Sequence, residues 1–177
     1  VVESRQLAAW KKERGVELDQ RQLRNAFGTF ATGVTVVTTL GEDGQPKAMT
    51  ANSFSSLSLD PPLLLWCPGK SADCYDDFRR ARRFAVHVLT AGQQAASNRF
   101  ATKAIDKFAG VGWSTGDGGL PLLDDFLTRF ECETEAVHPG GDHVIMVGRV
   151  VRISVAGEAG APLVFYGGKY RALSEAA

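Results

Sequence analysis

Small and hydroxyl-bearing side chains are concentrated at residues 50–58, where the sequence runs Thr-Ala-Asn-Ser-Phe-Ser-Ser-Leu-Ser. Such residues leave room for a flat ligand to approach the backbone. Their hydroxyl and amide groups also supply hydrogen-bond donors and acceptors for the edge of a heterocycle. A solvated strand edge followed by a turn explains the same composition, and the pattern alone favours that simpler interpretation.

A candidate phosphate site lies at Gly69-Lys70-Ser71, after an apolar run that ends at Cys67 and before a predicted helix at 72–82. Backbone N–H groups at a helix start, together with a lysine and a serine, form a phosphate site. The segment is not a Walker A motif, because Leu64 stands where the first glycine is required. The alternative is an ordinary helix capped by Ser71, and the pattern alone favours this alternative.

His143 follows Gly140-Gly141-Asp142 at the start of a predicted strand. Its imidazole is suited to hydrogen-bond an anionic or amide ligand, with Asp142 or a backbone group setting the tautomer. A turn histidine without a ligand is the alternative. A zinc site built from His138 and His143 lacks a third ligand nearby. The sequence contains neither the G-x-S-x-G elbow of a hydrolase nor the G-x-G-x-x-G dinucleotide fingerprint.

Strands are the main elements that must position these residues. β-Branched runs, alternation and punctuation by glycine and proline predict seven strands. Their ranges are about 34–39, 47–54, 63–67, 83–89, 126–137, 143–155 and 162–166. The run at 63–67 is apolar throughout, which is typical of a strand buried on both faces. Because hairpins connect most of the strands, we expect an antiparallel barrel.

Helices are few in this prediction. Apolar spacings of three and four, with capping residues, indicate helices at 1–16, 19–31, 72–82 and 91–102. We expect Gly33 to end the second of these. The glycine-rich stretch 110–121 predicts a loop. We expect an N-terminal extension over 1–18 and one folded domain over 19–177.

The composition excludes several function classes. The chain has 177 residues, 44% of them hydrophobic, and 20 basic side chains balance 20 acidic ones. This length and composition fit one globular domain with its own core. The absent net charge argues against a nucleic-acid partner and favours a small molecule. No apolar run is long enough to span a bilayer, and the N-terminus lacks the apolar core of a signal peptide. Three cysteines without a C-x-x-C pair indicate a reducing, cytoplasmic location.

Together these segments resemble the flavin reductase family with a split-barrel fold, the reductase partners of two-component flavin monooxygenases. The likeness covers about residues 20–173. It rests on the order and spacing of Leu23 to Thr38, Met49 to Pro62, Arg83 to Leu89, Lys107-Phe108-Ala109-Gly110, Gly141-Asp142-His143 and Tyr170-Arg171. The resemblance implies a mainly β protein, an antiparallel Greek-key split barrel of the FMN-binding type with a few flanking helices. It also implies a homodimer.

The resemblance also implies cofactors and the residues that hold them. FMN or FAD would bind each barrel, and NADH or NADPH would be the co-substrate. The isoalloxazine and ribityl chain are assigned to Thr50, Ala51, Asn52, Ser53, Ser55 and Ser56. The segment that continues toward the phosphate comprises Cys67, Lys70 and Ser71. Later phosphate or adenine contacts fall on Ser97, Arg99 and Phe100. The nicotinamide side is assigned to His143, with Tyr170 and Arg171.

The activity implied is hydride transfer from nicotinamide C4 to flavin N5, after which reduced flavin passes to a separate monooxygenase. We expect no obligatory acid or base, because the cofactors carry the chemistry. One alternative is a flavin carrier or sensor with the same barrel and no turnover. Another is a split-barrel oxidase acting on a vitamin-like substrate, which the Gly141-Asp142-His143 motif disfavours. The sequence leaves open FMN against FAD and NADH against NADPH.

Overall fold

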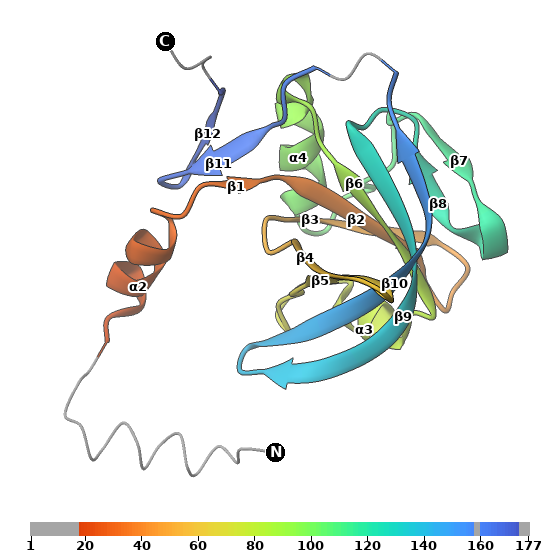
Figure 1. Cartoon of the computed structure of the whole chain (residues 1–177), viewed down its shortest axis with the longest axis horizontal. Helices are drawn as coiled ribbons and strands as arrows, with labels where there is room; N and C mark the ends of the chain where they lie inside the picture. Colours follow the sequence, from red (N-terminus) through yellow and green to blue (C-terminus); the bar gives the residue numbers. More distant parts are fainter. Residues whose placement is uncertain (1–17, 158–159, 174–177) are drawn as a thin grey trace.

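A computed structural model describes residues 18–157 and 160–173. Seven strands form one antiparallel sheet in the order β3-β2-β6-β9-β10-β5-β4 (Figure 1). Their bounds are β2 Thr35–Leu40, β3 Pro46–Ala51, β4 Ser55–Leu59, β5 Pro62–Trp66, β6 Arg83–Val88, β9 Thr128–Gly140 and β10 His143–Val155. The expected mainly β, antiparallel architecture is confirmed.

The sheet must curl, because its two edge strands follow one another in the chain. Flat, seven strands would separate β3 from β4 by about 29 Å. Only residues 52–54 join them, and such a link spans at most about 14 Å. The curl seen in Figure 1 follows from this short connection, and it places the segment 50–56 at the seam between the two edges.

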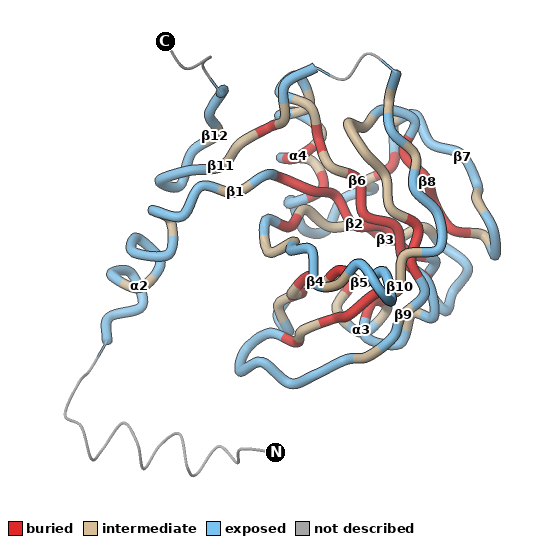
Figure 2. The backbone as a smooth tube through the Cα atoms, in the orientation of Figure 1, coloured by how far each residue is buried: buried red, intermediate tan, exposed pale blue. Residues whose placement is uncertain are grey.

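The core lies in two large clusters and a small third one of Ala85, Leu120 and Leu122. One fills the inside of the curled sheet and includes Trp66, which packs edge-on against Phe78 with ring centroids 4.9 Å apart. The other lies under helix α4 (Gln94–Ala101) and includes Val36 and Phe100, both fully buried. Figure 2 shows the buried backbone running through β2 and β6. Both large clusters draw residues from β2 and β3. A packed sheet of this kind gives the site a rigid support.

An arm extends from the barrel (Figure 1). It consists of helix α2 (Gln20–Phe27) and a small sheet of β1 (Thr32–Gly33), β11 (Val164–Tyr166) and β12 (Lys169–Arg171). Asp19 caps α2 by accepting hydrogen bonds from two backbone N–H groups. The helix buries none of its residues, and Phe27 and Phe30 are 74% and 77% exposed. Exposed aromatic side chains of this size are typical of surfaces that meet a partner.

The strand predictions were confirmed in type, with three exceptions. Strands β1, β4 and β12 were not predicted. The run at 63–67 is not buried on both faces, because residues of β5 alternate between buried Leu64 and Trp66 and half-exposed neighbours. The predicted loop at 110–121 contains a short hairpin of β7 (Trp113–Thr115) and β8 (Pro121–Leu123). Its glycines concealed that hairpin, since Gly118 and Gly119 take positive φ in the turn between the strands.

Two predicted helices are shorter than expected. Helix α2 ends at Phe27 and not near Gly33, because the N–H groups of Thr29 and Phe30 turn back onto carbonyls three residues earlier. Helix α3 covers only Tyr75–Arg80, and its N-cap is Cys74 in place of Ser71. The helix at 91–102 is present as one 3₁₀ turn followed by α4. The helix expected at 1–16 lies outside the described residues.

The described part of the chain holds no helix that is both long and apolar enough to cross a membrane. Its three cysteines, Cys67, Cys74 and Cys132, are all free thiols. Burial raises the pKa of Cys74 to about 11 and that of Cys132 to about 12, so both stay protonated and packed in the core.

Candidate functional site

The end of β3 and the end of β5 are joined by one serine. Ser53 Oγ accepts a hydrogen bond from the Cys67 N–H at 2.9 Å and donates to the Cys67 carbonyl at 3.4 Å. Around this contact Ala51 is buried, whereas Asn52, Ser55 and Ser56 are exposed. The segment therefore presents polar groups to solvent from a backbone fixed on both sides.

The loop after β5 is in turn joined to the tip of the β9–β10 hairpin. The Lys70 N–H donates to the Asp142 carbonyl at 2.9 Å, and the Val144 N–H donates to the Pro68 carbonyl at 3.2 Å. The Lys70 ammonium also donates to the Gly141 carbonyl at 2.5 Å. Residues 71 to 76 positions apart in the sequence are thus in contact, and the candidate phosphate loop and the hairpin tip form one surface.

His143 is half-exposed at that tip and is held on two sides. Its Nδ1 lies 2.8 Å from Asp142 Oδ1. The hydrogen bond and the nearby imidazole lower the pKa of Asp142 below its usual value. A Cβ added to Gly69 would lie 3.3 Å from His143 Nε2, so the ring rests against a residue without a side chain. Nδ1 is therefore engaged by the carboxylate, and Nε2 is the ring nitrogen left for a ligand.

Helix α4 closes the other end of the segment 50–56. Thr50 Oγ1 donates to the Ser97 carbonyl at 2.6 Å. Ser97 is fully buried, and its Oγ lies 2.9 Å from the Tyr170 hydroxyl, which also donates to Asn98 Oδ1 at 3.0 Å. The structure therefore brings Thr50, Ser97 and Tyr170 into one hydrogen-bonded chain.

The remaining predicted residues lie nearby with other contacts. Arg99 donates to the carbonyls of Asp106 and Lys107, both at 2.9 Å. Phe100 is fully buried and packs against Phe108 with ring centroids 5.5 Å apart. Arg171 is exposed on β12. The cofactor roles assigned to these residues stay predictions.

The phosphate site was predicted at the start of a helix, and this part of the prediction is wrong. Residues 69–74 form turns, with the Ala72 N–H donating to the Gly69 carbonyl, and α3 begins only at Tyr75. What the loop offers instead is the exposed Lys70 ammonium and the exposed Ser71 hydroxyl. Within the described residues, neither Ser71 Oγ nor the Asn52 amide makes a hydrogen bond to another side chain or to the backbone.

These groups fit a flavin. Its ring edge needs donors and acceptors on a surface without bulky side chains, and the segment 50–56 supplies them. Its phosphate needs a cation and hydroxyl or N–H donors, which Lys70 and Ser71 supply. The next surface along, around His143, is open to a second ligand.

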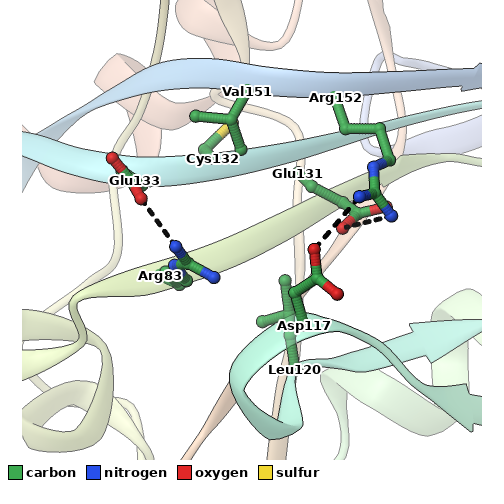
Figure 3. Close-up of a pocket in the computed structure, with 8 residues that line it drawn as sticks. All are labelled: Arg83, Asp117, Leu120, Glu131, Cys132, Glu133, Val151 and Arg152. Carbon is green, nitrogen blue, oxygen red and sulfur yellow. Dashed lines mark hydrogen bonds and ion pairs between the residues drawn. The ribbon is translucent and has the colours of Figure 1, made fainter.

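A hollow of about 170 Å³ lies elsewhere, on the outer face of the sheet (Figure 3). It contains none of the predicted site residues, and most of its charges are already paired. Arg83 bonds Glu133 at 2.8 Å, and Arg152 bonds Asp117 at 3.0 Å. Glu131 is buried between Arg129 and Arg152 at 3.8 and 4.0 Å. We therefore do not assign the cofactor to this hollow.

Two residues near the site were missed by sequence reasoning. Lys107 was recognised only as part of a motif, although its ammonium reaches both β3 and the loop after β5. Gly69 was identified in the phosphate loop but not as a neighbour of His143. A glycine beside a predicted ligand-binding histidine was a usable signal for close approach, whereas nothing in the sequence pairs Lys107 with residues 34 and 59 positions away.

The protein-family model described as "Flavin reductase like domain" matches residues 27–174 of this chain. The FMN reductase (NADH) SmoA of Agrobacterium fabrum is 47% identical over 152 residues, covering 86% of this chain and 85% of that protein. A probable flavin reductase of Rhizobium meliloti is 49% identical over 139 residues, 78% of this chain, and the match spans only 45% of that protein. The solved structure of Streptomyces globisporus NADH:FAD oxidoreductase SgcE6, in complex with NAD and FAD fragments, superposes with a TM-score of 0.83 at 41% identity, covering 90% of this chain and 98% of that one.

Proposed function

Because this chain belongs to the family of flavin reductase like domains, we propose that it transfers hydride from NADH or NADPH to FMN or FAD and supplies the reduced flavin to a separate monooxygenase. Similar proteins carry the same activity in their names: an FMN reductase (NADH), an NADH-dependent FAD reductase, and the reductase subunit HsaB of a flavin-dependent monooxygenase of Rhodococcus jostii.

The observation that supports this proposal most is the pair of backbone hydrogen bonds between the loop after β5 and the β9–β10 tip. They set Lys70 and Ser71, proposed for the flavin phosphate, beside His143, proposed for the nicotinamide. Hydride transfer requires two rings stacked at reacting distance. Ser53, in the segment proposed for the flavin ring, bonds Cys67, and the loop after Cys67 bonds the hairpin tip that carries His143. One connected stretch of backbone would therefore hold both rings.

The protein's part in the reaction is binding and orientation. When bound, a flavin supplies the redox chemistry by accepting hydride from nicotinamide C4 at N5. The Asn52 amide and the Ser53 backbone would orient the ring edge, and the Lys70 ammonium would neutralise the phosphate. His143, with Nδ1 held by Asp142, would present Nε2 to the nicotinamide carboxamide. The residues so used need neither give nor take a proton.

The proposal includes a homodimer, supported by exposed apolar side chains in two places. One lies on edge strand β4 and on the second half of β10, which expose Leu57, Leu59, Val151, Ile153 and Val155. The other is the arm with its two exposed phenylalanines. Surfaces of this kind are typical of contacts between copies of a chain.

The cytoplasm remains the compartment we propose, on the grounds that all three thiols are free. The product, reduced flavin, is the same whichever monooxygenase consumes it, so it does not identify the partner. We therefore propose only the class of partner, an oxygenase that consumes reduced FMN or FAD.

Oxidation of NADH and NADPH, followed by nicotinamide absorbance, tests the activity. Each nucleotide is combined with FMN, FAD or riboflavin, and each pairing is run against a protein-free control. We expect protein-dependent oxidation with at least one phosphorylated flavin. Flavin fluorescence quenching without any oxidation above the control would replace the reductase with the flavin carrier or sensor.

A further inference from the structure

Lys107 is a nearly buried cation in the connection between α4 and β7. Its side chain is only 10% exposed. The ammonium donates to the Ala48 carbonyl at 3.1 Å and to Asp73 Oδ1 at 3.2 Å. Lysine seldom gives up its hydration unless acceptors replace the water, so the two acceptors explain why the charge can be held there.

Those acceptors belong to two different segments of the flavin site. Ala48 lies on edge strand β3, two residues before Thr50, and Asp73 lies two residues after Ser71. As an edge strand, β3 has carbonyls with no neighbouring strand to bond them. Lys107 bonds one of these carbonyls and ties it to the phosphate loop.

The backbone around Lys107 is fixed from α4 and from the same loop. Arg99 donates to the Lys107 carbonyl and to the Asp106 carbonyl, both at 2.9 Å. Lys103 donates to the Ser71 carbonyl at 2.7 Å. Two lysines of the connection between α4 and β7, Lys103 and Lys107, therefore contact the phosphate loop. The backbone of Lys107 is also bonded by Arg99 of α4.

Asp73 is the charged partner in this arrangement. Burial by itself raises its pKa, but the hydrogen bond from Lys107 and the positive charge of that ammonium outweigh burial, so the pKa lies below its usual value. The carboxylate is ionised at neutral pH and Lys107 is engaged by it. Two of the three N–H donors of the ammonium thus join segments of the protein, and its charge is paired with Asp73.

We propose that Lys107 is a positioning residue for the flavin: it fixes the spacing between the ring-binding segment 50–53 and the phosphate-binding pair Lys70-Ser71. This inference rests on the proposed function and assigns a role to a residue outside the predicted contacts. A bound FMN or FAD must meet both segments at once, so a shift of one against the other lowers affinity without removing any group that touches the ligand.

The test is flavin affinity, measured by quenching of flavin fluorescence, which needs no turnover. We expect Lys107→Met to raise the Kd for FMN or FAD roughly ten- to a hundredfold. Lys107→Arg, which keeps the charge, should recover most of the affinity. The KM for NADH at saturating flavin should stay at the wild-type value, because His143 is held by other contacts.

Lys47→Met is the matched control. Lys47 lies on β3 and, like Lys107, pairs with an aspartate, Asp43, at 2.7 Å, but that pair closes the β2–β3 turn. It should leave flavin affinity unchanged. Equal losses in the Lys47 and Lys107 variants would show a general loss of stability and overturn the proposal, as would wild-type affinity in Lys107→Met.

Asp73→Ala keeps the test decisive if Lys107→Met does not fold. This variant removes the Lys107–Asp73 pair from the side of the aspartate and should weaken flavin binding similarly. The double variant should bind flavin no more weakly than either single variant, because all three lack the same interaction. Wild-type protein that binds no flavin would reject the proposed function itself. Wild-type protein that binds flavin, with variants that bind equally well, would reject only the role of Lys107.

Discussion

His87 should make the fold sensitive to mild acid. It is fully buried on β6, where its Nδ1–H donates to the Val36 carbonyl at 3.1 Å and its Nε2 accepts from the Leu123 N–H at 3.1 Å. Both ring nitrogens are used by the neutral imidazole, and a proton on Nε2 would break the second bond. Burial, which outweighs the hydrogen bond to Val36, lowers the pKa of His87 to about 3.

The sign and size of the change in the free energy of unfolding follow from the linkage between proton binding and folding. The unfolded chain takes up a proton near pH 6.5 and the folded chain does not, so the free energy of unfolding falls as the pH is lowered from that value toward about 3. Each pH unit within this window costs about 1.4 kcal/mol. Between pH 7 and pH 5 the loss attributable to His87 is roughly 2 kcal/mol.

Urea unfolding at pH 7, 6 and 5, at one protein concentration, measures this loss. His87→Gln carries no titrating ring, and its amide can still donate and accept, so its stability should change much less over the same range. Carboxylates contribute little here, because those with lowered pKa values titrate below pH 4. An equal pH dependence in wild type and His87→Gln would refute the assignment of a buried neutral imidazole.

Three further variants test the site and the dimer. His143→Ala should lower kcat/KM for NADH by roughly tenfold, the value of one hydrogen bond, while the flavin Kd measured by fluorescence stays unchanged; a loss of flavin affinity instead would move His143 to the flavin side. Lys70→Met should weaken FMN and FAD binding about tenfold and leave riboflavin, which has no phosphate, unaffected. Equal losses for all three flavins would contradict the phosphate role. Val151→Glu should shift the protein toward monomer in sedimentation analysis, whereas an unchanged mass would place the dimer contact elsewhere.

Much of the fold was predictable because its strands carry local signals. The β-branched run of β2 and the alternation of β6 each lie within one strand, and so periodicity identified them. Strand β4 carried no such signal, since its serines also suit a turn, and its pairing with β5 depends on contacts between strands. Helix α3 was predicted too long because distant residues hold the loop before it: the hairpin tip bonds Pro68 and Lys70, and two lysines bond Ser71 and Asp73. No local pattern contains these contacts.

The site was predictable as a set of motifs and not as a geometry. The sequence gathered Thr50 to Ser56, Lys70 and His143 as candidates, and the structure joins their segments through hydrogen bonds. It could not show that Thr50 bonds the Ser97 carbonyl, or that Lys107 supports the loop from a position outside the ligand contacts. Such contacts depend on how the sheet curls, which is decided by the short link between β3 and β4.

The most direct test of the account is the anaerobic reduction of flavin by NADH, followed by loss of the flavin's visible absorbance. Without oxygen, each NADH consumed must reduce one flavin, so the signal reports hydride transfer alone. We predict that FMN or FAD is bleached at a rate proportional to protein concentration and far above the protein-free rate. Bleaching at the protein-free rate, with flavin demonstrably bound, would contradict a reductase.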